Sequence, residues 1–266
     1  MKSHTALAII AACLAAPAAG AESAWEEVAP GVSIRLVSSD VITDDDTLWM
    51  GLEIDMPADT KTYWRVPGES GVPLSIDTRG SNGISDLSVS WPFPKRETHN
   101  GYLDHAYYGR VLIPLKASVS AQDITVQADI TLGICSEICV PARAGFTLTP
   151  QPASPDASHE FRIRQALANV PLPHDGEGLV GDARFDEHRN AIVVERMDTD
   201  FPIDTMIAEI VGTGLVFDVP QLARSGREIV FPLLGRPQHD KLDHGVVRVS
   251  FDGPDGSFEI ERTLVN

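Results

Sequence analysis

The strongest constraint on the fold is a stretch in which apolar and polar residues alternate strictly, from residue 124 to residue 132. In an extended strand, every second side chain points to the same face. A strand with one apolar and one polar face is typical of antiparallel sheets that are covered on one side. The segment therefore predicts a sheet that packs against a second layer. The residues expected to face that layer are Ile124, Val126, Ala128, Ile130 and Leu132.

Shorter segments of the same kind lie on both sides of this stretch. Residues 32–36, 48–54 and 144–148 each place apolar side chains at alternate positions. The chain of 266 residues also contains 21 glycines and 19 prolines, which favour frequent turns over long helices. Together these features predict an antiparallel β-sandwich over residues 22–150.

The second half has the same character after a break in the pattern. Residues 149–158 are rich in proline and serine and show no apolar period, as expected of a domain boundary. A short helix is predicted from Ser158 to about Asn169. We therefore expect an all-β protein with two sandwich domains, residues 22–150 and 151–266, joined by this linker. The further strands predicted are 191–194, 215–219, 229–234, 245–251 and 258–264.

The first 21 residues have the composition of an export signal. Lys2 is their only charged residue, an apolar run extends from Ala6 to Ala16, and Ala19-Gly20-Ala21 suits signal peptidase. We expect cleavage before Glu22 and a periplasmic mature protein, with no later segment apolar enough to span a membrane. An alternative is a lipobox ending at Cys13, which would anchor the protein to a membrane through lipid.

The charge of the chain disfavours two classes of partner. Lysine and arginine total 21 against 38 aspartates and glutamates, for a net charge of −17. An acidic surface repels both phosphate backbones and anionic lipids. We therefore expect no binding to nucleic acid or to membrane surfaces.

After removal of the signal, two cysteines remain, Cys135 and Cys139. They lie between two predicted strands, where their Cα atoms can approach within the roughly 4.4–6.8 Å that a disulfide requires. Closing so small a loop adds only about 2 kcal/mol of stability, which is little for domains with ample apolar residues. A redox centre, a structural staple and a metal site all remain open, and the redox interpretation is favoured.

Four blocks of sequence resemble the N-terminal periplasmic domain of the DsbD and ScsB thiol-disulfide reductases, especially the ScsB-like branch. They occur in the order of that family and span about 80 residues. No sharp motif of this kind occurs in the second half. The blocks are Tyr63–Pro73, Trp91–Arg96, Gly109–Leu115 and Gly133–Ala142.

The resemblance implies an immunoglobulin-like domain whose cysteine pair receives electrons from a thioredoxin-like domain and passes them to exported proteins. It implies that Cys139 bonds to the partner and that Cys135 resolves this bond. It also places a loop that caps the sulfurs within residues 95–108, with Tyr102 and Tyr107 as candidate shields. We expect no cofactor, because the two sulfurs carry the electrons.

Two features depart from the full reductases. The Cys-x3-Cys spacing is that of the ScsB-like branch and is shorter than in DsbD itself. The sequence ends at Asn266 without the membrane-embedded electron conduit and the thioredoxin domain. We therefore expect the electron donor to be a separate thioredoxin-like or membrane protein.

Two other functions use the same cysteines. Soft thiolates suit Cu(I), and His99 or His105 would supply the third ligand of a copper site. The methionines form no cluster of the kind that copper proteins often use. In the third alternative the protein is a non-catalytic interaction module, in which the disulfide only pins a hairpin.

Overall fold

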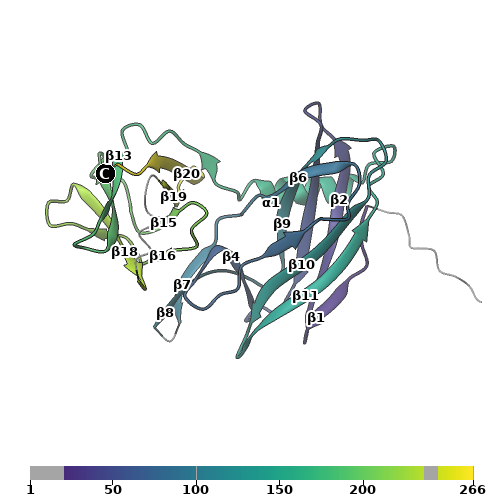
Figure 1. The fold of residues 1–266 in the computed structure, drawn as a ribbon, viewed down its shortest axis with the longest axis horizontal. Coiled ribbons are helices and arrows are strands. Elements are labelled where there is room, and N and C mark those ends of the chain that lie inside the picture. Colours follow the sequence, from purple (N-terminus) through teal and green to yellow (C-terminus); the bar gives the residue numbers. More distant parts are fainter. Residues whose placement is uncertain (1–20, 100, 237–244, 266) are drawn as a thin grey trace, which may run out of the picture.

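The structure, a computed structural model, describes residues 21–99, 101–236 and 245–265. Within these ranges the chain is almost entirely β-structure, with one short helix (Figure 1). The all-β prediction is confirmed. Apart from Ala21, the predicted export signal lies outside the described residues, and so does the lipobox at Cys13.

The first half contains two antiparallel sheets. One has the strand order β1-β2-β3-β9-β6, and the other has the order β11-β10-β4-β8-β7, with β5 paired to β10. The strands of the first sheet are β1 (Glu26–Ala29), β2 (Val32–Ile42), β3 (Thr47–Asp55), β6 (Ile84–Val89) and β9 (Val111–Val119). Those of the second are β4 (Lys61–Gly68), β5 (Ser75–Asp77), β7 (Lys95–His99), β8 (Tyr102–Tyr108), β10 (Val126–Cys135) and β11 (Cys139–Leu148).

The two sheets enclose one hydrophobic core. The alternating stretch forms β10 and the residues just before it, and all five of its apolar side chains are buried in this core. From the facing sheet, Ile34, Leu52 and Ile113 pack into the same core. Trp64 of β4 is also fully buried there. The prediction that the polar–apolar alternation defines a covered sheet is confirmed.

The helix α1 (Ala157–Leu167) follows the proline- and serine-rich segment and packs on β2, β3 and β9 of the first half. It begins two residues earlier than a Ser158 cap would place it, because the Asp156 carboxylate accepts hydrogen bonds from the backbone N–H groups of Ser158 and His159. Ile163 anchors the helix with a side chain only 1% exposed. No helix within the described ranges is long and apolar enough to cross a bilayer.

The second half has two smaller sheets, with the orders β12-β20-β19-β15 and β13-β14-β18-β16, and β17 also pairs with β18. Their inner faces form a separate hydrophobic core that includes Ile192, Phe231 and Ile260. The hairpin predicted at the last two strands is present, with Asp252 opposite Ser257. The strands are β12 (Leu172–Pro173), β13 (Val180–Asp186), β14 (Ala191–Arg196), β15 (Ile207–Ile210), β16 (Val216–Phe217), β17 (Gln221–Leu222), β18 (Glu228–Leu234), β19 (Val246–Gly253) and β20 (Gly256–Thr263).

Polar contacts join the two halves, and β4, β7 and β8 lie on the side of the first half that faces the second (Figure 1). Arg65 of β4 donates to Glu209 at 2.7 Å, to Ser250 at 3.0 Å and to Glu259 at 2.5 Å. Arg96 of β7 donates to the backbone oxygen of Met206 at 2.6 Å. The division into two domains, with a boundary at residue 150, stays a prediction.

Candidate thiol-disulfide site

Cys135 and Cys139 form a disulfide at the tip of the β10–β11 hairpin. They are the last of ten consecutive residue pairs in this ladder, and their Cα atoms lie 4.0 Å apart, slightly closer than the range expected from the sequence, because the two residues lie directly opposite each other. The turn between them contains only Ser136, Glu137 and Ile138. A long regular ladder therefore fixes a very short loop, so the position of the sulfurs is set by the sheet.

The two cysteines differ in their exposure. Cys135 is 7% exposed and packs with Tyr63 and Ala106 in a small apolar cluster that Tyr108 borders. Cys139 is exposed, as are the three residues of the turn. An incoming sulfur must reach its target in line with the bond that breaks, so accessibility decides which cysteine a partner attacks. Of the two cysteines, Cys139 is the more accessible to such an attack.

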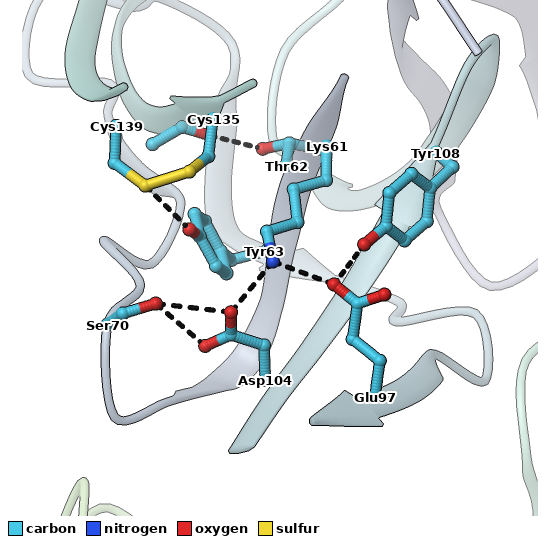
Figure 2. The surroundings of a disulfide bond; sticks show 10 residues. Lys61, Thr62, Tyr63, Ser70, Glu97, Asp104, Tyr108, Cys135 and Cys139 are labelled. Carbon is cyan, nitrogen blue, oxygen red and sulfur yellow. Dashed lines mark hydrogen bonds and ion pairs between the residues drawn. A yellow bond between two sulfur atoms is a disulfide. The ribbon is translucent and has the colours of Figure 1, made fainter. Parts of the chain in front are cut away.

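Tyr63 lies directly beside the disulfide (Figure 2). Its hydroxyl oxygen is 3.5 Å from Cys139 Sγ, while its ring is only 1% exposed. A disulfide sulfur carries no proton, so the tyrosine hydroxyl is the donor in this contact. Burial raises the pKa of Tyr63, which keeps the hydroxyl protonated at neutral pH.

A cluster of charged side chains lies next to Tyr63, on the side away from the disulfide. Lys61 of β4 is paired in register with Cys135, and its Nζ donates to Asp104 at 2.8 Å and to Glu97 at 2.7 Å (Figure 2). Burial disfavours the ammonium, but the hydrogen bonds to Asp104 and Glu97 outweigh this effect and raise the pKa of Lys61. The cluster thus holds one cation between two carboxylates.

Two further hydroxyl groups complete this cluster. Ser70 donates to Asp104 at 2.9 Å, and Tyr108 donates to Glu97. Burial and this hydrogen bond to Glu97 raise the pKa of Tyr108 to about 12. Each carboxylate thus has a hydroxyl donor as well as the Lys61 ammonium, as buried charges require.

The two tyrosines expected to shield the sulfurs lie in different places. Tyr107 is 7% exposed within the core of the first half, and its hydroxyl donates to the backbone oxygen of Pro92 at 2.7 Å. Tyr102 is 56% exposed at the start of β8, opposite His99 in the β7–β8 register. The aromatic side chain that contacts a sulfur is Tyr63. A cap role for Tyr102 stays a prediction.

Sequence reasoning did not single out Lys61 or Tyr63. A signal for them was present, because Tyr63 begins the first of the four matching blocks and Lys61 precedes it by two positions. In a strand this spacing places both side chains on one face. Only the pairing of β4 with β10, however, brings that face to the cysteines.

Exposed apolar side chains flank the disulfide. Ile138 in the turn is 74% exposed, and Val140, just after Cys139, is 41% exposed. Val72 is 38% exposed, and its backbone oxygen accepts a hydrogen bond from Gly133 two residues before Cys135. Exposed apolar side chains grouped in this way are more typical of a surface that contacts another protein than of a sheet face that stays in solvent.

Of the two histidines proposed as copper ligands, His105 is buried away from solvent, and the side chain of His99 lies outside the described part of the structure. His105 is 1% exposed, packs edge-on against Trp64 and bonds through Nδ1 to the backbone oxygen of Val66 at 2.9 Å. Burial lowers its pKa to about 4. Within the part of the chain that the structure describes, no group of three or more His, Cys, Asp or Glu side chains is arranged to hold a metal ion.

The site is thus a β-sandwich that presents a disulfide at the tip of a sheet hairpin, with Cys135 buried and Cys139 exposed. The family model described as "Thiol:disulfide interchange protein DsbD, N-terminal" matches residues 35–151. The resemblance to this family found in the sequence is therefore confirmed for residues 35–151.

Solved structures extend the similarity to the second half. The N-terminal periplasmic domain of ScsB from Proteus mirabilis matches with a TM-score of 0.66 and 20% sequence identity. The match covers 92% of this chain and 98% of that domain, so both halves share its fold. Comparison with curated proteins found no match.

Proposed function

We propose that this protein is a periplasmic thiol-disulfide interchange protein that transfers electrons between a thioredoxin-like or membrane donor and exported disulfide-containing proteins. The match of residues 35–151 to the DsbD N-terminal family model supports the chemistry. The observation that carries the proposal is the unequal exposure of the two cysteines at the tip of one hairpin, with Cys135 buried and Cys139 exposed.

The oxidised pair is first reduced by the donor. A donor thiolate attacks Cys139 Sγ, a donor–Cys139 disulfide forms, and Cys135 leaves as a thiolate. The second cysteine of the donor then attacks the donor sulfur that is bonded to Cys139. A disulfide forms within the donor, and Cys139 is released as a thiolate. Two electrons reach the pair, and the donor ends with one disulfide.

The reduced pair then passes these electrons to an acceptor. The Cys139 thiolate attacks the acceptor disulfide, and one acceptor sulfur leaves as a thiolate. Cys135 attacks Cys139 Sγ, restores the disulfide of the hairpin and releases the second acceptor sulfur. Both acceptor thiolates take up protons from solvent, so electrons and atoms balance.

The apolar side chains around the hairpin tip support docking of a protein partner. Ile138, Val140 and Val72 offer contacts that would be covered when a partner sulfur approaches Cys139. Because the attacking sulfur is part of a folded partner, the partner surface must fit around the turn.

The proposed location is the periplasm. The structurally similar ScsB domain is periplasmic by its description. The predicted signal peptidase site before Glu22 agrees with this location. The intact mass of protein from the periplasmic fraction tests the site, since a lipid on Cys13 would add the mass of diacylglycerol.

Trapping of mixed disulfides tests the proposed function. The Cys135→Ser variant retains Cys139 without its resolving thiol, so it should accumulate a covalent complex with a thioredoxin-like protein. The Cys139→Ser variant should accumulate little. Affinity purification from the periplasm and non-reducing gels would show a shifted band that dithiothreitol removes, and mass spectrometry would identify the partner.

The outcomes separate the proposal from its alternatives. Equal trapping by both variants would overturn the assignment of roles to the two cysteines. No trapping by either variant, together with stoichiometric Cu(I) binding by the reduced wild-type protein, would replace thiol exchange with copper binding. No trapping and no copper binding would leave a structural disulfide in an interaction module.

A further inference from the structure

We propose that Tyr63 is a catalytic residue of the exchange reaction and that its hydroxyl donates a hydrogen bond to Cys139 whenever this sulfur carries negative charge. The inference rests on the proposed function and concerns how the site makes Cys139 reactive. It starts from the 3.5 Å contact between the Tyr63 hydroxyl and Cys139 Sγ.

The Tyr63 ring is held between two glycines. A methyl group on Gly71 would lie 2.5 Å from Tyr63 Cδ1, and one on Gly133 would lie 2.9 Å from Cδ2. Both distances are too short for carbon atoms, so a larger residue at either position would press on the ring and on its neighbours Pro67 or Val72. Gly133 is on β10, two residues before Cys135, and Gly71 follows β4 in the chain. The backbone on both sides thus directs the hydroxyl at the sulfur.

Thr62 fixes the strand that carries Tyr63. Its hydroxyl donates to the backbone oxygen of Gly133 at 2.9 Å, and both groups are buried. This bond ties β4 to β10 one residue away from Tyr63. The orientation of the Tyr63 hydroxyl toward Cys139 is therefore determined by the pairing of the strands as well as by packing around the ring.

The contact gains strength when the disulfide opens. A neutral disulfide sulfur is a weak acceptor, whereas a thiolate is a charged one, and hydrogen bonds to charged groups are roughly twice as strong as neutral ones. Cys139 is a thiolate at two points of the cycle, when the donor releases it and when it attacks the acceptor. A hydrogen-bond donor that is already in place at both points stabilises the thiolate without any rearrangement of the site.

The charges near Tyr63 make such a donor necessary. Lys61 neutralises only one of the two carboxylates it contacts, and the turn between the cysteines adds a further carboxylate. This surplus of negative charge opposes ionisation of a nearby thiol. The charged and titratable groups on the elements around the contact are Lys61, Lys95, Glu97, Asp104, Tyr108 and Glu137.

The test measures the pKa of the Cys139 thiol in the mature chain carrying Cys135→Ser, where Cys139 is the only cysteine. The rate of alkylation by iodoacetamide is followed against pH. Adding Tyr63→Phe removes the hydroxyl and retains the ring, and it should raise the thiol pKa by about one unit, with roughly tenfold less thiolate at neutral pH. No partner is needed, so the result is independent of whether exchange partners are found.

Two further variants complete the design. Tyr107→Phe also removes one buried tyrosine hydroxyl, but its hydrogen bond goes to Pro92, so the pKa of Cys139 should not change. Gly71→Ala keeps the Tyr63 hydroxyl and displaces the ring, so it should raise the pKa as Tyr63→Phe does. An unchanged or lower pKa in Tyr63→Phe would overturn the proposal. If that variant does not fold, an unchanged pKa in Gly71→Ala would overturn it.

Discussion

The contacts of Arg65 predict that the two halves stabilise each other. Its guanidinium lies 4.0 Å from the centre of the Trp64 ring and binds two carboxylates of the second half, Glu209 and Glu259. The Arg65 side chain is 13% exposed, and those of Glu209 and Glu259 are 8% and 19% exposed. Replacing Arg65 by Met keeps an apolar stem over Trp64 and removes the charge.

The expected loss follows from the charges left behind. Removing one partner of a buried ion pair costs about 3–5 kcal/mol, because the other charge stays buried and uncompensated. Arg248 offsets part of this cost, since it also lies near Glu209, at 3.3 Å, and Glu259, at 3.5 Å. We therefore expect Arg65→Met to lower the free energy of unfolding by about 3 kcal/mol, the lower end of the range for a buried pair.

Urea unfolding followed by tryptophan fluorescence measures this loss, because Trp64 lies directly under the guanidinium. Arg79→Met is the matched control: Arg79 pairs with Asp77, but its side chain is 92% exposed, and its removal should cause no measurable change. Adding Glu209→Gln to Arg65→Met should recover part of the stability, since it removes an unpaired charge. A loss below about 1 kcal/mol, as for exposed pairs, would refute the reasoning.

Two other predictions concern stability. The double variant Cys135→Ser, Cys139→Ser should remain folded in thermal melts, because closing this small loop contributes only about 2 kcal/mol; a chain unfolded at room temperature would instead indicate a structural staple. Burial lowers the pKa of His105 from 6.5 to about 4, so between these values the unfolded chain binds more protons and the free energy of unfolding falls as pH falls. The fall should reach about 3 kcal/mol across this window and be largely absent in His105→Gln; equal slopes in urea titrations of both proteins would contradict it.

Much of the fold was predictable because local patterns agree with the tertiary structure. The alternation at 124–132 fixes which face of β10 is buried, and the turn residues around 252–256 mark the last hairpin. Strands of two to four residues, such as β12 and β17, were missed because so short a segment shows no period. The spacing of Cys135 and Cys139 indicated that they could form a disulfide, which the structure contains, and their redox role stays a prediction.

The surroundings of the disulfide depend on pairings between distant segments, which no local pattern reveals. Tyr107 was a candidate shield because it lies in the predicted loop, but on a strand neighbouring residues point to opposite faces. Tyr107 therefore turns into the core, and the adjacent Tyr108 turns toward Glu97. Deciding between them requires the register of β8 against β4, in which Tyr108 pairs with Lys61.

Strand β4 links the disulfide to the junction between the halves. Lys61 and Tyr63 occupy alternate positions and so share one face of the strand, and the guanidinium of Arg65, two residues further on, lies over the Trp64 ring. A slip of one residue in the register of β4 would turn Lys61 and Tyr63 to the other face and remove both the sulfur contact and the charged cluster. The packing of Trp64 in the core opposes such a slip. The contacts of Arg65 with Glu209 and Glu259 therefore tie the strand that carries Tyr63 to the second half.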